Sequence, residues 1–337
     1  MSLKNESVPM TLEKKAYLLA RGTVGIDPKY IPKTTRSTAG PSAGGTGTVF
    51  FSSNGKRVCL TIDENSPFRI KPLNPENDNW VIEENGKTVV TGNIETPLAH
   101  CPKQAYINIS EGCKFNCKYC SVPLRKGRTK TKEEILKIVE NAWNLGPFEA
   151  ISITSGVPET PEKECERVLE VIPELLKYGV PIGVSIYVFD GCSKILKDAN
   201  VSEVKYNVEA ATEEIFNQVC PGLSYDDLIN ELRGAVKVFG KGKVYSNLII
   251  GLGETDEEIT ETVELLAKEG IITELRPVSE NPLRINDCYM KRPDEKRLLK
   301  LYKQQKQIFE NYGLNPDESQ TMCSKCGGCD LVPFTDD

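Results

Sequence analysis

The sequence predicts an α/β fold: a partial, TIM-like (β/α)6 barrel between a small N-terminal antiparallel β region and a cysteine-rich C-terminal tail. Three observations lead to this prediction. From residue 103 onward, apolar strand-like runs alternate with amphipathic helical segments. Before residue 95, short strand-like runs follow one another without helices between them. Near the end, three of the twelve cysteines lie between residues 323 and 329. We expect three regions, 1–102, 103–312 and 313–337.

Composition limits the kind of protein. Hydrophobic residues at 39% and charged residues at 27% are typical of a soluble globular chain. The net charge of −6 argues against nucleic acid as a partner. No apolar run reaches the roughly 20 residues that span a bilayer, and the polar start does not resemble a signal peptide. We therefore expect a cytoplasmic protein without a membrane partner, whose cysteines bind metal and do not form disulfides.

The N-terminal region is expected to hold one helix and a small sheet. Residues 11–21 read as a helix with Thr11 as N-cap. The Gly-rich segment 37–47 matches neither a P-loop nor a dinucleotide fingerprint, so a flexible or substrate-covering loop is expected. Asn85-Gly86 predicts a hairpin turn. The expected strands are 48–51, 58–62, 68–70, 80–82 and 88–90.

The second region is expected to supply six β/α units with a working face at the carboxyl ends of the strands. The expected strands are 105–109, 149–154, 181–187, 203–208, 244–251 and 272–277. The expected helices are 131–145, 160–178, 190–198, 212–237 (broken at Pro221-Gly222), 255–269 and 292–312. His100, the only histidine, lies in the connector before this region.

A cysteine loop follows the first of these strands. Cys113, Cys117 and Cys120 have the spacing C-x3-C-x2-C. Three thiolates so close can converge on one soft metal centre. Structural zinc requires four ligands, and no fourth cysteine lies near in the sequence. An iron–sulfur cluster held by three cysteines would leave one iron open. Zinc is the alternative.

This loop resembles the signature of the radical S-adenosylmethionine (radical SAM) superfamily, including the aromatic Tyr119 before the last cysteine. The resemblance implies a [4Fe-4S] cluster whose open iron chelates S-adenosylmethionine, and reductive cleavage of that cofactor to a 5′-deoxyadenosyl radical. It extends over about residues 103–280. The residues that it implies for S-adenosylmethionine binding are Tyr119, Thr154, Ser155, Asn207, Glu209, Gly251 and Gly253.

Each of these motifs also has an ordinary structural explanation. The segment Gly251-Leu252-Gly253-Glu254 could be a strand-to-helix turn before an N-cap at Thr255, and Glu209 could be a surface carboxylate. Their occurrence in order, each at a strand end, favours the resemblance. No catalytic side chain beyond the cofactors is predicted.

The motifs are most similar to the lipoyl synthase and biotin synthase branch. Lipoyl synthases carry a Thr-Ser pair, an Asn-x-Glu and a Pro-Gly-x-x-Tyr, as here at residues 154–155, 207–209 and 221–225. However, the N-terminal three-cysteine motif and the C-terminal Arg-Ser-Ser-Tyr of lipoyl synthases are absent, and biotin synthases lack such a tail. The chain resembles the divergent archaeal two-protein lipoyl synthases.

The tail carries a second cysteine motif. Cys323, Cys326 and Cys329, at C-x2-C-x2-C, read as three ligands of an auxiliary iron–sulfur cluster, with zinc as the alternative. Residues 313–322 could stretch ~33 Å, enough to return the tail to the barrel mouth. We therefore prefer Cys288 as the fourth ligand, with Cys101 and Cys59 as further candidates. Cys165, Cys192 and Cys220 are expected to be buried or incidental.

The resemblance favours insertion of sulfur from the auxiliary cluster into an unactivated carbon, on an octanoyl chain carried by a protein. The alternatives are radical SAM methylation or carbon rearrangement in the biosynthesis of another cofactor, and a non-catalytic zinc-binding barrel. The expected partners are a lipoyl-type carrier protein or a small-molecule substrate, a ferredoxin or flavodoxin as electron donor, and a paralogous partner enzyme. The sequence does not name the substrate.

Overall fold

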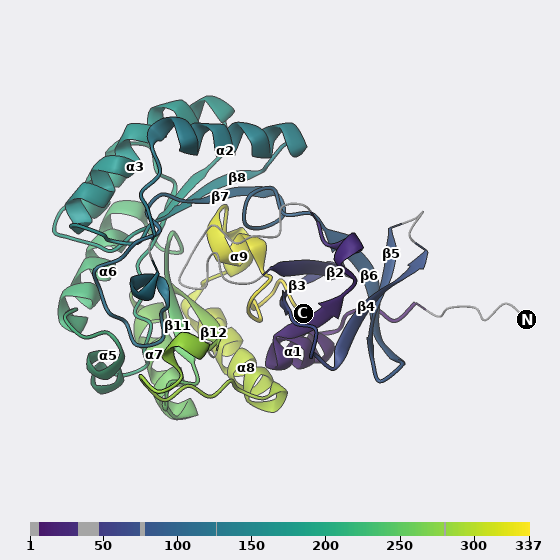
Figure 1. Cartoon of the computed structure of the whole chain (residues 1–337). Coiled ribbons are helices and arrows are strands. Elements are labelled where there is room, and N and C mark those ends of the chain that lie inside the picture. Colours follow the sequence, from purple (N-terminus) through teal and green to yellow (C-terminus); the bar gives the residue numbers. More distant parts are fainter. Residues whose placement is uncertain (1–6, 33–46, 75–77, 126, 280) are drawn as a thin grey trace, which may run out of the picture.

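The computed structural model describes residues 7–32, 47–74, 78–125, 127–279 and 281–337. A six-stranded β-barrel and a six-stranded parallel sheet covered by helices lie side by side, with the C-terminal tail between them (Figure 1). Residues 37–46 of the predicted Gly-rich loop fall outside the described residues. None of the helices in the described part of the chain combines the length and apolar character that crossing a bilayer requires.

The N-terminal region folds as a closed barrel with strand order β1-β3-β2-β6-β5-β4. Helix α1 (Leu12–Arg21) begins at Thr11, whose side chain accepts a hydrogen bond from the Lys14 N–H, as predicted. The hairpin between the last two strands turns at Asn85 and Gly86, both at positive φ. The strands are β1 (Thr23–Ile26), β2 (Thr48–Ser53), β3 (Lys56–Ile62), β4 (Phe68–Asn74), β5 (Asn79–Glu84) and β6 (Lys87–Glu95).

The expected small antiparallel sheet is therefore corrected to a closed barrel. The missing element is β1, which pairs in parallel with both β3 and β4 and so joins the two ends of the sheet. Its four residues are too short to show an alternating pattern. Closure removes the exposed strand edges that an open sheet would leave.

The second region is a sheet of parallel strands in sequential order, β7 to β12. The strands are β7 (Gln104–Asn108), β8 (Ala150–Thr154), β9 (Ile182–Ser185), β10 (Glu203–Lys205), β11 (Val244–Ile250) and β12 (Ile272–Pro277). The helices are α2 (Lys132–Leu145), α3 (Pro161–Leu175), α4 (Cys192–Asp198), α5 (Glu213–Val219), α6 (Tyr225–Phe239), α7 (Asp256–Lys268), α8 (Glu295–Tyr312) and α9 (Met322–Cys326). Short 3-10 turns lie at Pro28–Tyr30, Val122–Leu124, Leu176–Tyr178, Pro282–Arg284 and Pro316–Glu318.

The two faces of this sheet differ in polarity. Side chains such as Ile107, Ile153 and Val184 pack in the core with residues of the surrounding helices. Successive side chains of a strand point to opposite faces, so the residues between them share the inner face. That face is polar: it carries Gln104, Tyr106, Asn108, Ser152, Thr154, Ser185, Glu203, Lys205, Glu274 and Arg276. Parallel sheets covered on both faces are normally apolar throughout, so the polar face indicates a functional interior.

The tail enters this inner face from the amino-terminal ends of the strands. Glu203, the first residue of β10, accepts hydrogen bonds from Thr321 N at 2.9 Å and Thr321 Oγ1 at 2.8 Å. Met322 N donates to Ser152 Oγ at 2.9 Å. The expectation that the tail returns to the barrel mouth was wrong. The inner face offers acceptors for the tail backbone close to the end of α8, so the tail turns in there and does not stretch along the barrel.

Candidate functional site

The cysteine loop follows β7. Hydrogen bonds hold it to three other segments of the parallel-sheet region. Lys114 N donates to Val157 O and Lys118 N donates to Val219 O, each at 2.7 Å. Arg284, buried after β12, donates from Nε to Cys120 O at 2.8 Å and from Nη2 to the Asn116 side chain at 2.7 Å. These bonds fix the loop at the carboxyl ends of the strands.

The thiols of the loop lie in a partly buried environment. Burial raises the pKa of the Cys113 thiol, and raises the pKa of Cys120 to about 12. A hydrogen bond with the thiol of Cys220 lowers the pKa of Cys117. Cys220 also lies 3.8 Å from the Tyr119 hydroxyl. The sequence analysis expected Cys220 to be buried or incidental. It is buried, but its position at the end of α5 gave no sign that this helix meets the cysteine loop.

These residues fit an iron–sulfur cluster. Their donor set is entirely thiol, which such clusters use. Among the residues that the structure describes, no three Cys, His, Asp or Glu side chains surround a point where a single metal ion would sit.

Three of the predicted S-adenosylmethionine residues meet beside the loop. Glu209 follows β10 with a φ of 64°, unusual for a residue other than glycine. Hydrogen bonds from Glu209 N to Asn247 O and from Ile249 N to Glu209 O hold this conformation. Burial raises the pKa of Glu209 to about 7, while hydrogen bonds from Asn207 and Tyr119 act in the opposite direction. The carboxyl group of Glu209 thus lies next to the cysteine loop.

Thr154 is the last residue of β8, and Ser155 follows it. The Ser155 hydroxyl accepts from Ser110 N at 2.9 Å and donates to the buried Glu164 carboxylate at 2.5 Å. Ser155 therefore ties the start of the cysteine loop to α3. The Thr154 carbonyl accepts from Ile109 N at 3.0 Å, so this residue is also joined to the loop.

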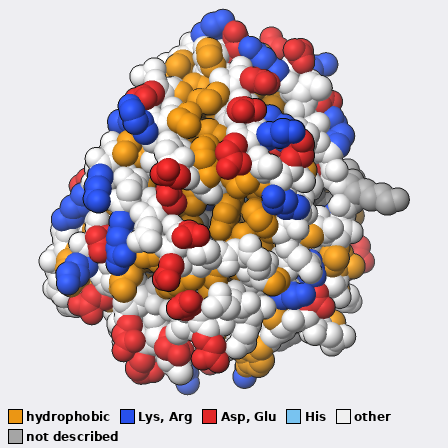
Figure 2. Space-filling view, turned by 90° about the vertical axis from the view of Figure 1, so that its left-hand side faces the viewer, with side chains coloured by type: hydrophobic (Ala, Val, Ile, Leu, Met, Phe, Trp, Pro, Cys, Tyr) orange, Lys and Arg blue, Asp and Glu red, His pale blue; other side chains and the backbone are white. Residues whose placement is uncertain are grey.

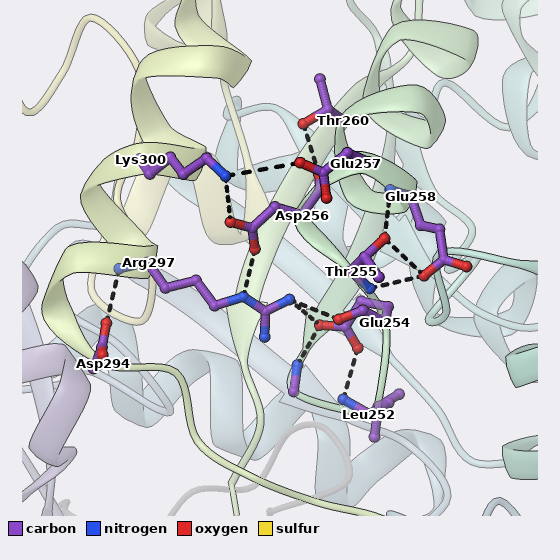
Figure 3. Close-up of polar contacts among 11 residues, drawn as sticks. Leu252, Glu254, Thr255, Asp256, Glu257, Glu258, Thr260, Asp294, Arg297 and Lys300 are labelled. Atoms are coloured by element: carbon purple, nitrogen blue, oxygen red, sulfur yellow. Dashed lines mark hydrogen bonds and ion pairs between the residues drawn. The ribbon is translucent and has the colours of Figure 1, made fainter.

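The turn after β11 is organised by a carboxylate (Figure 3). Gly251 and Gly253 have φ values of 110° and 113°, and a Cβ at Gly251 would lie 2.2 Å from Lys291 O. Glu254 accepts from Gly251 N at 2.7 Å and from Leu252 N at 2.8 Å, and forms an ion pair with Arg297 at 2.9 Å. The Gly251 N–H already donates its hydrogen bond to Glu254. The adenine of S-adenosylmethionine, if it lies at this turn, would therefore contact the turn by packing and not through this N–H. The sequence analysis did not assign Glu254 a role.

A cavity of about 440 Å³ opens beside the cysteine loop. Phe115 of the loop packs against Tyr187 with ring centroids 4.9 Å apart. Three carboxylates, Asp190, Asp227 and Glu231, line the cavity. The pKa of Glu231 is raised, mainly by burial and to a smaller extent by the negative charges of Asp190 and Asp227. On the face shown in Figure 2, acidic and basic side chains surround a band of apolar ones. The cavity has aromatic walls and an acidic rim.

Comparison with known proteins identifies the barrel. The family model of the radical SAM superfamily matches residues 107–266. Over these residues, just under half of the chain, the sequence is similar to a radical SAM domain, and we refer to this matched part as the radical SAM domain. The matched region includes the cysteine loop and every predicted S-adenosylmethionine residue, but neither the N-terminal barrel nor the tail.

Curated relatives of the radical SAM domain include two kinds of synthase. A biotin synthase of Magnetococcus marinus is 28% identical over 168 residues, 47% of this chain and 51% of that protein. A lipoyl synthase of Picrophilus torridus is 25% identical over 185 residues, 51% of this chain and 64% of that protein. The alignments thus span from about half to just under two thirds of these relatives.

Solved structures agree on the fold. SuiB of Streptococcus suis aligns with a TM-score of 0.52 at 16% identity, over 64% of this chain and 48% of SuiB. The FeFe-hydrogenase maturase HydG from Carboxydothermus hydrogenoformans aligns with a TM-score of 0.50 at 17% identity, over 63% of this chain and 52% of HydG. Identities this low show a common fold and nothing further.

A second group of cysteines lies at the other end of the radical SAM domain. The Cys323 sulfur accepts a hydrogen bond from Lys205 Nζ at 2.9 Å. The thiol of Cys59 in β3 lies beside Cys329 and lowers the pKa of Cys329 to about 5, with Arg276 acting in the same direction. The thiol of Cys101 lies beside Cys326 and lowers the pKa of Cys326.

The structure does not bring Cys288 to this group, which corrects our preference for it as the fourth ligand. Cys288 lies in the loop after β12, where its electrostatic neighbours are Asp287, Arg284 and Lys118. The tail instead lies beside Cys101 and Cys59. The preference failed because it depended on the tail reaching the carboxyl ends of the strands.

Charged residues between the two cysteine groups were missed by the sequence analysis. Lys205 and Glu274 form a buried ion pair at 3.2 Å, and Arg276 lies 3.9 Å from Asp330. Burial raises the pKa of both Cys323 and Glu209, and the charges of Lys205 and Arg276 act in the opposite direction on both, so these cations lie within reach of both groups. The available signal was a charged side chain within a buried parallel strand, which is rare unless the charge is paired.

Proposed function

We propose that this chain is a radical SAM enzyme that inserts sulfur at an unactivated carbon, with an octanoyl chain on a carrier protein as the preferred substrate. The observation that carries the proposal is the pair of cysteine groups on one sheet, with a polar inner face between them. When bound, the groups at Cys113–Cys120 and at the tail would supply radical generation from S-adenosylmethionine and sulfide, respectively. The relatives named lipoyl synthase and biotin synthase support this choice.

The side chains of this chain have positioning roles in the proposal. Cys113, Cys117 and Cys120 would hold the first cluster, and Arg284 fixes the loop that carries them. Glu209 would accept hydrogen bonds from the ribose hydroxyls of S-adenosylmethionine. The tail covers the inner face at the amino-terminal ends of the strands, where Lys205 and Glu274 are buried.

The cavity beside the loop supports an apolar substrate. Aromatic walls at Phe115, Tyr187 and Phe189 suit an acyl chain better than a charged group. The proposed partners are a lipoyl-type carrier protein, a ferredoxin or flavodoxin that supplies electrons, and a paralogous partner enzyme. A small-molecule acyl substrate is the alternative to the carrier.

A second candidate function is methylation or carbon rearrangement, with the tail centre passing electrons only. The observation that favours it is the location of the tail at the amino-terminal ends of the strands, while the cysteine loop leaves their carboxyl ends. A sulfur donor must contact the substrate carbon, whereas an electron donor need not.

Isotope labelling separates the two candidates. The enzyme is reconstituted with iron and 34S-sulfide, freed of unbound sulfide, and incubated with S-adenosylmethionine, reductant and an octanoylated carrier. The proposal predicts a product that carries 34S, with about one turnover per chain. A product without sulfur, or with unlabelled sulfur, would reject sulfur donation. A control reconstituted with ordinary sulfide gives the reference mass.

A further inference from the structure

The tail alone supplies three thiols, one fewer than a cluster with four protein ligands uses. We propose that Cys59 of the N-terminal barrel and Cys101 of the connector join the tail cysteines in one iron–sulfur site. This inference rests on the proposed function only in assuming an auxiliary cluster at the tail. It does not require that the cluster donate sulfur.

The backbone brings Cys59 to the tail. The Cys59 N–H donates to Gly328 O at 2.6 Å, so β3 pairs directly with the segment between the last two tail cysteines. A Cβ added to Gly328 would lie 3.3 Å from the Cys59 Cβ and 3.1 Å from the Phe50 ring. A glycine at this position therefore allows the tail to approach β3 closely enough for Cys59 and Cys329 to meet.

A separate set of contacts brings Cys101 to the tail. Cys101 forms a β-bridge with Gln104, whose side chain donates to Met322 O at 2.9 Å. The Cys101 and Cys326 side chains are buried in one small cluster. Cys59 and Cys101 thus arrive from two different segments at the same buried place.

Cations of the N-terminal barrel and the sheet fix the tail around these thiols. Lys15 donates to Gly327 O at 2.7 Å, and Arg57 donates to Cys326 O at 2.7 Å. Lys205 donates to the Cys323 sulfur. N–H donors that point at cysteine sulfur are typical of metal-bound thiolates, whose charge they stabilise.

Five thiols around one buried place fit a cluster better than a single ion. Structural zinc takes four ligands around one point, and the described residues form no such point. A cubane cluster binds one thiolate on each of its four iron atoms, so one of the five thiols would lie beside the cluster without binding iron. The assignment also gives the N-terminal barrel a role, since it lies outside the matched radical SAM region but supplies part of the site.

The test uses full-length protein in which Cys113, Cys117 and Cys120 are changed to Ala, so that iron reports on the tail site alone. Cys59→Ala and Cys101→Ala are added together to this background. The matched control adds Cys165→Ala and Cys192→Ala, two buried cysteines that contact each other in the helical layer. Iron, zinc and labile sulfide are measured after anaerobic reconstitution, together with the EPR spectrum of the reduced protein.

We expect the background and the matched control to hold about four iron atoms per chain. The Cys59/Cys101 variant keeps the three tail thiols, which can still hold a cluster with one open iron, so we expect less iron and a changed EPR spectrum. Unchanged iron and an unchanged spectrum in that variant would overturn the ligand assignment. Zinc in place of iron in the background, or no metal there, would overturn the assignment and the auxiliary cluster together.

Serine variants cover the case in which the alanine variant fails to fold. Cys59→Ser with Cys101→Ser keeps side-chain size, and an oxygen ligand should shift the EPR spectrum. An unshifted spectrum with full iron would also overturn the assignment. If the assignment holds and the 34S experiment gives an unlabelled product, only sulfur donation fails.

Discussion

At the scale of single residues, Glu209 shows how a site departs from local preference. A left-handed backbone is unfavourable for glutamate by about 1–2 kcal/mol, and a buried carboxyl adds a desolvation cost. The backbone bonds to Asn247 and Ile249 hold the residue there nonetheless. Residues held against such costs tend to belong to functional sites.

We predict that Glu209→Ala weakens S-adenosylmethionine binding without unfolding the chain. A lost hydrogen bond to a charged group costs about 1.5–3 kcal/mol, or roughly 10- to 150-fold in affinity. Isothermal titration of the reconstituted protein measures the effect. Glu213→Ala, an exposed carboxylate at the start of α5, is the matched control. Equal affinity in both variants would remove Glu209 from the cofactor site.

Residues of the two sites differ in how far the sequence could reveal them. The spacing of Cys113, Cys117 and Cys120 predicts a metal-binding loop because ligands close in sequence are also close in space. Cys59 and Cys101 are far from the tail in sequence. They replace Cys288 as the preferred additional ligands only once the structure shows where the tail runs. Arg284 contributes a hydrogen bond to a backbone carbonyl, and such a role leaves no motif.

At the scale of elements, the sequence predicts well those helices and strands whose hydrophobic pattern repeats over many residues. Each expected barrel strand corresponds to an observed one, because apolar runs and helical periods extend along the chain. The sequence did not reveal β1 or the closure of the N-terminal barrel. Closure depends on pairing between distant strands, and no local pattern encodes it.

The turn from β11 to α7 gives an element-scale prediction. Glu254 satisfies the N–H groups of Gly251 and Leu252, which would be left without an acceptor in Glu254→Ala. We expect a loss of about 1.5–3 kcal/mol in the free energy of unfolding, measured by urea denaturation of the metal-free chain. The matched control is Glu257→Ala, because Glu257 is 76% exposed in the first turn of α7, and it should change little. Equal losses in both variants would contradict this role for Glu254.

At the scale of the whole molecule, three regions far apart in sequence meet at the amino-terminal end of the sheet. The tail lies between the N-terminal barrel and the parallel sheet (Figure 1). There its cysteines meet Cys59 and Cys101, while the cysteine loop lies after the carboxyl end of β7. The two cysteine groups therefore lie on one sheet, but different contacts hold each of them in place. This separation predicts that the tail site can be removed without losing the first.

We predict that changing Cys323, Cys326 and Cys329 together to Ala leaves one cluster per chain. This variant should still form 5′-deoxyadenosine, because the cysteine loop is held by contacts outside the tail. It should release no sulfur-containing product. Iron analysis and chromatography of the nucleoside measure both effects. Loss of 5′-deoxyadenosine in a variant that still folds would show that the two groups are not separable.

The most direct test of the account is formation of 5′-deoxyadenosine from S-adenosylmethionine. The protein, reconstituted anaerobically and reduced with dithionite, is compared with the variant in which Cys113, Cys117 and Cys120 are Ala, and the nucleoside is quantified by mass spectrometry. We expect 5′-deoxyadenosine from the unaltered chain and none from the variant. Equal amounts from both, or none from a fully loaded unaltered chain, would contradict the assignment of the cysteine loop.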